Sequence, residues 1–344
     1  MSSHTYDWTA RDLARLILPP LLALALCSIL IHAGNALGLL PPPQPILDPD
    51  KTILFHQSRA SQSKQDAEIV LIGDSSCMAG VDALQLSERL PGGPPVINLA
   101  LIIGLGLDVY EEALNQFLIH NPEQVRVAVL LVTPQKLKKE DDNSYFATLW
   151  RSLSDGLTGP PAEQPPDRIS ELLGMRLFRL HLLTYLLAVP LNGERTGFYG
   201  FSSAMRDYLT VHHGSLVDPG TYNPVRRAQE TNYFLSPAFG QESRHFRARL
   251  PPEVQLVAGL MPVPETHVGR DYRTKQTELL RQWNQWLQAD HLLTNLPATL
   301  PDGLFASGAH LNEHGQRRFT ALLAVELANV LRPNDRRGKR DLTR

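Results

Sequence analysis

The sequence contains little cysteine and no excess of charge of either sign. Its two cysteines, Cys27 and Cys77, lie in an apolar segment and in a short turn-like segment, so we do not expect a disulfide between them. No cysteine or histidine spacing resembles a zinc site. With 33 basic and 35 acidic residues, the net charge of −2 does not support binding to nucleic acid. We therefore predict no metal and no nucleic-acid partner.

Charged residues are also missing near the N-terminus, from Leu16 to Leu40. At about 1.5 Å per helical residue, roughly twenty residues cross the hydrocarbon core of a bilayer. Arg11 and Arg15 precede the segment, which places residues 1–15 in the cytoplasm and the rest of the chain outside. We predict a transmembrane anchor at 16–40, and a cleaved signal peptide remains the alternative.

The remaining chain divides by composition and pattern. A proline-rich stretch reads as a stiff spacer, and two halves of one domain flank a segment without clear periodicity. A final basic stretch containing proline and glycine has the composition of a disordered tail. The predicted parts are a spacer at 41–51, a first domain part at 52–134, an insertion or lid at 135–250, a second domain part at 251–332 and the tail at 333–344.

The insertion leaves two questions open. Met175–Leu191 is apolar but carries arginines, which is consistent with a core helix, a lid over the site or an in-plane membrane helix. The aromatics of the segment are candidates for stacking on sugars, although most are more simply explained as core; they are Tyr199, Phe201, Tyr222, Tyr233 and Phe234.

Outside the insertion, short apolar runs alternate with amphipathic segments. This alternation predicts an α/β fold with a central parallel sheet and helices on both faces, in three layers. The predicted strands are 69–72, 96–100, 125–132, 254–260 and 291–293, and the predicted helices are 82–90, 107–120, 274–289 and 313–331.

A serine follows the first predicted strand in Gly73-Asp74-Ser75. Glycine permits a sharp exit from the strand, and a serine on a strand-to-helix turn has an exposed hydroxyl beside backbone N–H groups. Far downstream, His310 directly precedes the last predicted helix. A nucleophile near the start and a base near the end of the chain predict a serine-dependent esterase or acyltransferase with catalytic Ser75 and His310.

The loops that follow parallel strands meet at one sheet edge, so their residues are candidates for the same site. We expect the backbone N–H of Ser75 and that of Gly104 or Gly106 to stabilise an oxyanion, with Gln135 as a further candidate. Gly104-Leu105-Gly106 lacks the third glycine of a dinucleotide loop, and we predict no cofactor.

These motifs resemble the SGNH, or GDSL-like, superfamily of hydrolases and acyltransferases. The resemblance covers residues 66–134 and 254–331, and it rests on Gly73-Asp74-Ser75 and on the segment from His310 to Gly315. Ser76 stands where the motif has leucine, and Val132-Thr133-Pro134-Gln135 stands where the family has an asparagine. The resemblance implies a three-layer α/β/α fold with a central parallel sheet.

The family also places an aspartate three residues before the histidine, where this chain has Ser307. Three alternatives follow. Asp302 reaches His310 from a shifted position; or a backbone carbonyl or Ser307 orients the histidine in a dyad; or the site is degraded and binds without catalysis.

The segment from His310 resembles that of membrane-anchored proteins that O-acetylate exported polysaccharides. This implies an O-acetyltransferase in the bacterial inner membrane, with a periplasmic domain and a polysaccharide acceptor. It further implies a multi-spanning membrane acyltransferase and other synthesis or secretion subunits as partners. A carbohydrate or lipid esterase, and a non-catalytic glycan-binding or scaffold subunit, remain the alternatives.

Overall fold

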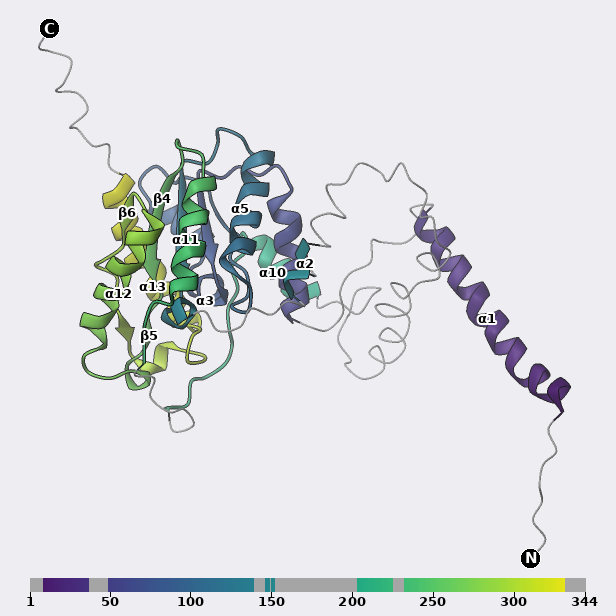
Figure 1. The fold of residues 1–344 in the computed structure, drawn as a ribbon. Coiled ribbons are helices and arrows are strands. Elements are labelled where there is room, and N and C mark those ends of the chain that lie inside the picture. Colours follow the sequence, from purple (N-terminus) through teal and green to yellow (C-terminus); the bar gives the residue numbers. More distant parts are fainter. Residues whose placement is uncertain are drawn as a thin grey trace, which may run out of the picture. The chain divides into compact units, whose positions relative to one another are not determined.

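The computed structural model describes residues 9–36, 49–138, 146–148, 150–151, 203–224 and 232–331 (Figure 1). The chain divides into two units, 1–48 with 160–203 and 49–159 with 204–344. The predicted helix Met175–Leu191 and the tail at 333–344 lie outside the described residues.

In the first unit the structure describes helix α1 (Ala10–Ala36), which contains Pro19 and Pro20. None of the helices in the described ranges combines the length and the apolar character needed to cross a membrane. The anchor predicted at 16–40 is therefore not confirmed.

The second unit is an α/β fold around a parallel sheet of five strands in the order β2-β1-β3-β4-β6. The strands are β1 (Ile69–Gly73), β2 (Val96–Asn98), β3 (Val127–Val132), β4 (Gln255–Leu260) and β6 (His291–Leu292). A second pair, β5 (Val263–Pro264) and β7 (Thr299–Leu300), lies beyond the end of β4. The predicted parallel sheet is confirmed.

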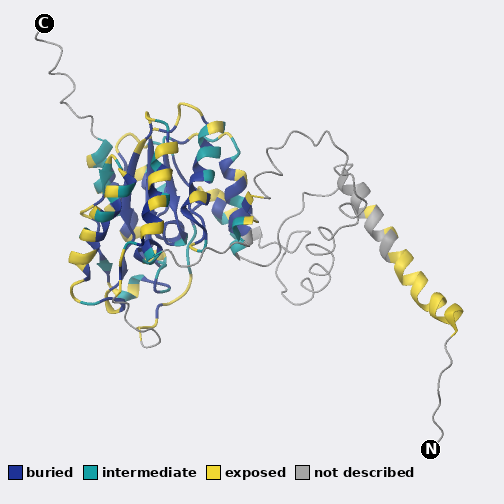
Figure 2. Cartoon of the chain, viewed as in Figure 1, coloured by how far each residue is buried: buried dark blue, intermediate teal, exposed yellow. Residues whose placement is uncertain are grey.

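Burial explains why the apolar runs became central strands. Every residue of β1 and of β3 is buried, as expected for strands covered on both faces. β1 pairs with β2 on one side and β3 on the other, so that Ile69 lies opposite both Val96 and Val127. The site at the end of β1 is thus held by the most buried part of the sheet (Figure 2).

Helices cover the two faces of the sheet. β2 lies on one side of β1, whereas β3, β4 and β6 follow one another on the other side. The chain therefore crosses the sheet in one direction from β1 to β2 and in the opposite direction in the later connections. Because each crossover is right-handed, the helices of the two directions lie on opposite faces of the sheet. Contacts agree: α11 packs on α5 and α12, and α13 packs on α3 and α4. The helices are α2 (Pro49–Ser61), α3 (Ser75–Gly80), α4 (Ala83–Arg89), α5 (Leu107–His120), α10 (Ser203–Val211), α11 (Pro237–Arg249), α12 (Tyr272–Leu287) and α13 (Glu313–Leu331).

Two helices differ from the sequence predictions. The spacer was expected to extend to Lys51, but α2 already begins at Pro49 and packs on α5. Helix α11 falls within the predicted insertion, yet Phe239 and Phe246 are buried in the core of the α/β unit. α2 and α11 both begin with a proline, Pro49 and Pro237. Proline is compatible with the first turn of a helix, where its missing N–H is not needed.

Candidate active site

Ser75 is the first residue of α3, directly after the turn that ends β1. Gly73 has φ +156°, and a Cβ there would lie 1.7 Å from the carbonyl oxygen of Leu131 on β3. The turn can therefore approach β3 this closely only with glycine at this position. This close approach places Ser75 at the carboxyl edge of the sheet.

Asp74 holds the turn in place and is fully buried. Its carboxylate accepts hydrogen bonds from the N–H of Ser76 at 2.9 Å and from the N–H of Thr133, after β3, at 2.8 Å. The Ser76 hydroxyl donates to the same carboxylate. Asp74 thus caps α3 and ties β1 to β3, leaving the neighbouring Ser75 hydroxyl directed into the site.

His310 lies in the loop before α13, and Ser307 shapes that loop. The Ser307 hydroxyl oxygen accepts hydrogen bonds from the N–H of His310 at 3.0 Å and from that of Ala309 at 3.3 Å. The Ser307 hydroxyl therefore binds the backbone of its own loop and not the imidazole of His310.

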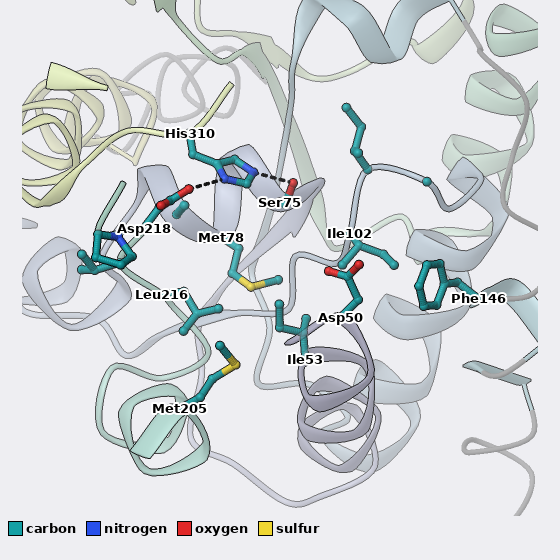
Figure 3. Close-up of a pocket in the computed structure, with 15 residues that line it drawn as sticks. Asp50, Ile53, Ser75, Met78, Ile102, Phe146, Met205, Leu216, Asp218 and His310 are labelled. Carbon is teal, nitrogen blue, oxygen red and sulfur yellow. Dashed lines mark hydrogen bonds and ion pairs between the residues drawn. The ribbon is translucent and has the colours of Figure 1, made fainter. Parts of the chain in front are cut away.

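The structure brings Ser75 and His310 together and adds a third residue, Asp218 (Figure 3). Ser75 Oγ lies 2.9 Å from His310 Nε2, and His310 Nδ1 lies 2.8 Å from Asp218 Oδ2. The side chains of His310 and Asp218 are 30% and 29% exposed, so a substrate can reach the group. This is the arrangement of a nucleophile, a base and an orienting carboxylate.

The charge state of Asp218 suits this role. The hydrogen bond with His310 lowers the pKa of Asp218, and the N–H of Gly220 lowers it further, while partial burial opposes both. The carboxylate is consequently ionised at neutral pH and accepts the Nδ1 proton of His310. Nε2 is then left with a lone pair that can accept the Ser75 proton.

Asp302, the acid proposed from the sequence, lies elsewhere, and that expectation is wrong. Its carboxylate accepts hydrogen bonds from the Thr266 hydroxyl at 2.6 Å and from the Thr266 N–H at 3.1 Å. Asp302 therefore ties two loops together, whereas Asp218 occupies the place beside His310. The sequence around Asp218, Val217-Asp218-Pro219-Gly220, signals only a turn, so no pattern pointed to it.

The turn from Ile102 to Gly106 carries the two glycines considered for the oxyanion. The Tyr110 hydroxyl donates to the Ile102 carbonyl at 2.9 Å. The buried Lys136 ammonium donates to the Ile103 carbonyl at 3.0 Å and also to that of Leu105. Because C=O and N–H of a trans peptide point in opposite directions, the Gly104 N–H points away from Lys136.

Gly104 is the better placed of the two glycines. It lines the same cavity as Ser75 and His310, and its N–H has no hydrogen-bond acceptor within the part of the chain that the structure describes. Gly106 instead precedes α5 as its N-cap. Gln135 does not line this cavity; its side-chain amide lies 3.4 Å from the Tyr233 hydroxyl and 3.5 Å from His267 Nε2.

Lys136 offers a test of this turn. Replacing it with methionine removes the donor for two carbonyls, so we expect the turn to loosen and kcat for ester hydrolysis to fall by roughly 10- to 100-fold. KM should change little, because the effect acts on the tetrahedral intermediate. Lys138→Met is the matched control, since Lys138 lies on the same 3₁₀ helix (Pro134–Lys138) but packs over the Tyr233 ring. Equal kcat for both variants would contradict a positioning role.

The site opens into a cavity of about 660 Å³ formed by the second unit. Among the described residues, no group of three histidine, cysteine, aspartate or glutamate side chains is arranged to hold a metal ion. Serine, imidazole and carboxylate, in this order, are the groups used in acyl transfer through a serine nucleophile.

Comparison of the sequence with protein-family models and with curated proteins finds no match to either. The case for function therefore depends on the geometry of Ser75, His310 and Asp218.

Proposed function

We propose that this chain is a serine-dependent acyl-ester hydrolase or O-acyltransferase of the SGNH type. The observation that carries the proposal is the continuous chain of hydrogen bonds from Ser75 through His310 to Asp218. An isolated serine or histidine in a loop is common, but three residues from distant parts of the chain meeting in this order are what nucleophilic catalysis requires.

In the proposed mechanism, Ser75 Oγ attacks the carbonyl carbon of the ester while His310 Nε2 takes its proton. Asp218 stabilises the imidazolium that forms. The N–H groups of Ser75, which is the first residue of α3, and of Gly104 hydrogen bond to the oxyanion.

His310 then protonates the leaving alcohol, and an acyl group remains on Ser75. In the second half of the reaction, water or an acceptor hydroxyl loses a proton to His310 and attacks the acyl-enzyme. Hydrolysis and transfer thus use the same residues and differ only in which hydroxyl reaches the acyl group.

Several features support the SGNH assignment. The nucleophile follows the first strand of a parallel sheet, and the histidine precedes the last helix. The acid differs, because Asp218 comes from the segment between the two domain parts and not from the position three residues before the histidine. Ser76 and Gln135 also depart from the family pattern.

The setting proposed for this activity is the outer side of a bacterial inner membrane. The uncharged stretch 16–40 and the preceding Arg11 and Arg15 support an anchor. An exported polysaccharide as acceptor, and a membrane acyltransferase as partner, remain proposals that depend on the resemblance of the segment from His310 to Gly315. The burial of Tyr222 and Tyr233 favours a core role over sugar stacking for these two aromatics.

A fluorophosphonate probe tests the proposal directly, because it phosphonylates only serines that are activated as nucleophiles. We expect the full-length protein in detergent to gain one probe, which peptide mass spectrometry places on Ser75. Heat-denatured protein is the control and should gain none. Labelling that is absent, or that falls on another serine, would refute the proposed function.

A further inference from the structure

The walls of the cavity beside Ser75 are unusually apolar for a site that accepts an acetyl group and a sugar. Apart from Ser75, His310, Gly104 and the two aspartates Asp50 and Asp218, the lining residues within the described ranges are all apolar. They are Ile53, Met78, Ala79, Ile102, Ile103, Phe146, Met205, Leu216, Val217 and Pro219. A site for a glycan would need polar groups that converge on hydroxyls.

The size of the cavity also exceeds what an acetyl group needs. At about 660 Å³ it falls in the range of pockets that enclose a whole drug-sized ligand. Figure 3 shows that it extends from Ser75 and His310 past Met78 and Leu216 toward Met205 and Ile53. Methionine side chains adapt to flexible apolar ligands, and two of them lie along this path.

We propose that this cavity binds the alkyl chain of the acyl group, so that the substrate is a neutral ester of a medium- or long-chain acid. The inference rests on the function proposed for Ser75. The acyl group stays bonded to Ser75 through both halves of the reaction, whereas the alcohol leaves after the first. A pocket that includes Ser75 therefore assists both steps when it holds the acyl chain.

Charge on the wall restricts the chain further. Asp50 and Asp218 place two carboxyl groups on the lining of an otherwise apolar cavity. Asp218 lies beside His310 at the Ser75 end of the cavity. An anionic chain end at the other end would be buried mainly among apolar side chains, which is costly. Among the lining residues that the structure describes, none is a lysine or an arginine. We therefore expect uncharged chains to be preferred over chains that end in a carboxylate.

The experiment is a chain-length series with the full-length protein and p-nitrophenyl acetate, butyrate, octanoate and dodecanoate. Each buried methylene group should raise kcat/KM by up to roughly fourfold. We expect octanoate to exceed acetate by at least about 50-fold. A second series keeps an acetyl group and lengthens the alcohol, and this series should be flat. A flat acyl series, or a rise only in the alcohol series, would overturn the proposal.

Variants locate the effect in the cavity. Met205→Trp, or the milder Met205→Phe if the first does not fold, fills the end of the cavity away from Ser75. The ratio of kcat/KM for octanoate to that for butyrate should fall by about tenfold or more, because the longer chain loses its burial. Val211→Trp, on the same helix but 61% exposed, should keep the wild-type ratio. Equal ratios in all variants would refute the proposal that this cavity binds the acyl chain.

The fluorophosphonate probe separates failure of this inference from failure of the proposed function. If Ser75 is labelled and acetate and octanoate esters react equally, the enzyme assignment stands and the acyl-chain pocket is refuted. If no serine is labelled and no ester reacts, the proposed function fails, and the acyl-chain pocket fails with it.

Discussion

Replacing Ser75 with alanine should lower kcat for ester hydrolysis by about 10⁴-fold or more, because no acyl-enzyme can then form. The residual rate would come from the N–H groups of the oxyanion site acting on water. Ser75 is partly exposed and its hydroxyl contacts His310, so its loss should change the melting temperature little. The measurement is hydrolysis of p-nitrophenyl butyrate by the full-length wild-type and variant proteins.

Ser76→Ala is the matched control for this variant. Ser76 is adjacent in sequence but buried, and its hydroxyl binds Asp74. Its removal leaves a buried carboxylate with one donor fewer, which should cost about 1–3 kcal/mol of stability. The folded fraction of Ser76→Ala should retain most of the wild-type kcat. Comparable activity of Ser75→Ala and wild type would refute the mechanism in which Ser75 is the nucleophile.

A nearby thiol does not offer an alternative nucleophile. Cys77 lies two residues after Ser75 but is fully buried in the core. Burial, together with the charge of Asp74, raises the pKa of the Cys77 thiol well above its usual value. The thiol therefore stays protonated and out of contact with substrate, and activity of Ser75→Ala could not be attributed to it.

The central sheet could be predicted because its strands carry an unambiguous signal. β1 and β3 are continuous apolar runs, and such runs are stable when helices cover both faces of a parallel sheet. The turn after β1 could also be predicted, because glycine permits a sharp exit from a strand. The structure adds that Gly73 lies close against the carbonyl of Leu131. Ser75 and His310 followed from the ends of these elements, and the structure places them in contact.

Asp218 could not be predicted as the carboxylate beside His310, because it lies in no helix or strand with a recognisable sequence pattern. Asp218 follows α10 in an irregular stretch, and only the folded chain brings it to within 2.8 Å of His310 Nδ1. Asp302 was plausible in the sequence because it lies close to His310 along the chain. The 3₁₀ helix Asp302–Leu304 instead directs its carboxylate to Thr266. The short distance along the chain between Asp302 and His310 gave a wrong prediction, because the conformation of the loop decides where the carboxylate points.

The location of Asp218 also bears on the alternatives for function. The sequence leaves a degraded, purely binding site open because position 307 is a serine and not an aspartate. A carboxylate is nevertheless present beside His310, so that absence no longer argues for a non-catalytic subunit. What separates an esterase from a transferase is the accepting hydroxyl, whereas the acyl chain that we propose for the cavity beside Ser75 is common to both reactions.

Asp218→Asn should lower kcat by roughly 10³- to 10⁴-fold while the protein stays folded. The amide cannot stabilise the imidazolium, and its NH₂ group favours the wrong tautomer of His310. Asp302→Asn is the matched control and should keep kcat within about twofold, since Asp302 binds Thr266 and not the histidine. Kinetics of both variants with p-nitrophenyl butyrate decide between the two aspartates. A large loss in Asp302→Asn alone would reverse the assignment.

The pH dependence of stability gives an independent check of the same contact. Because the hydrogen bond with His310 lowers the pKa of Asp218 in the folded state, its contribution to stability is present above the pKa of the unfolded chain, about 4. The contribution is lost as the pH falls through the lower folded-state pKa. Wild type should therefore exceed Asp218→Asn in free energy of unfolding at pH 6, and the difference should shrink below about pH 4. Urea denaturation at several pH values measures it, and a difference that is constant with pH would mean that the carboxylate of Asp218 is not paired with His310.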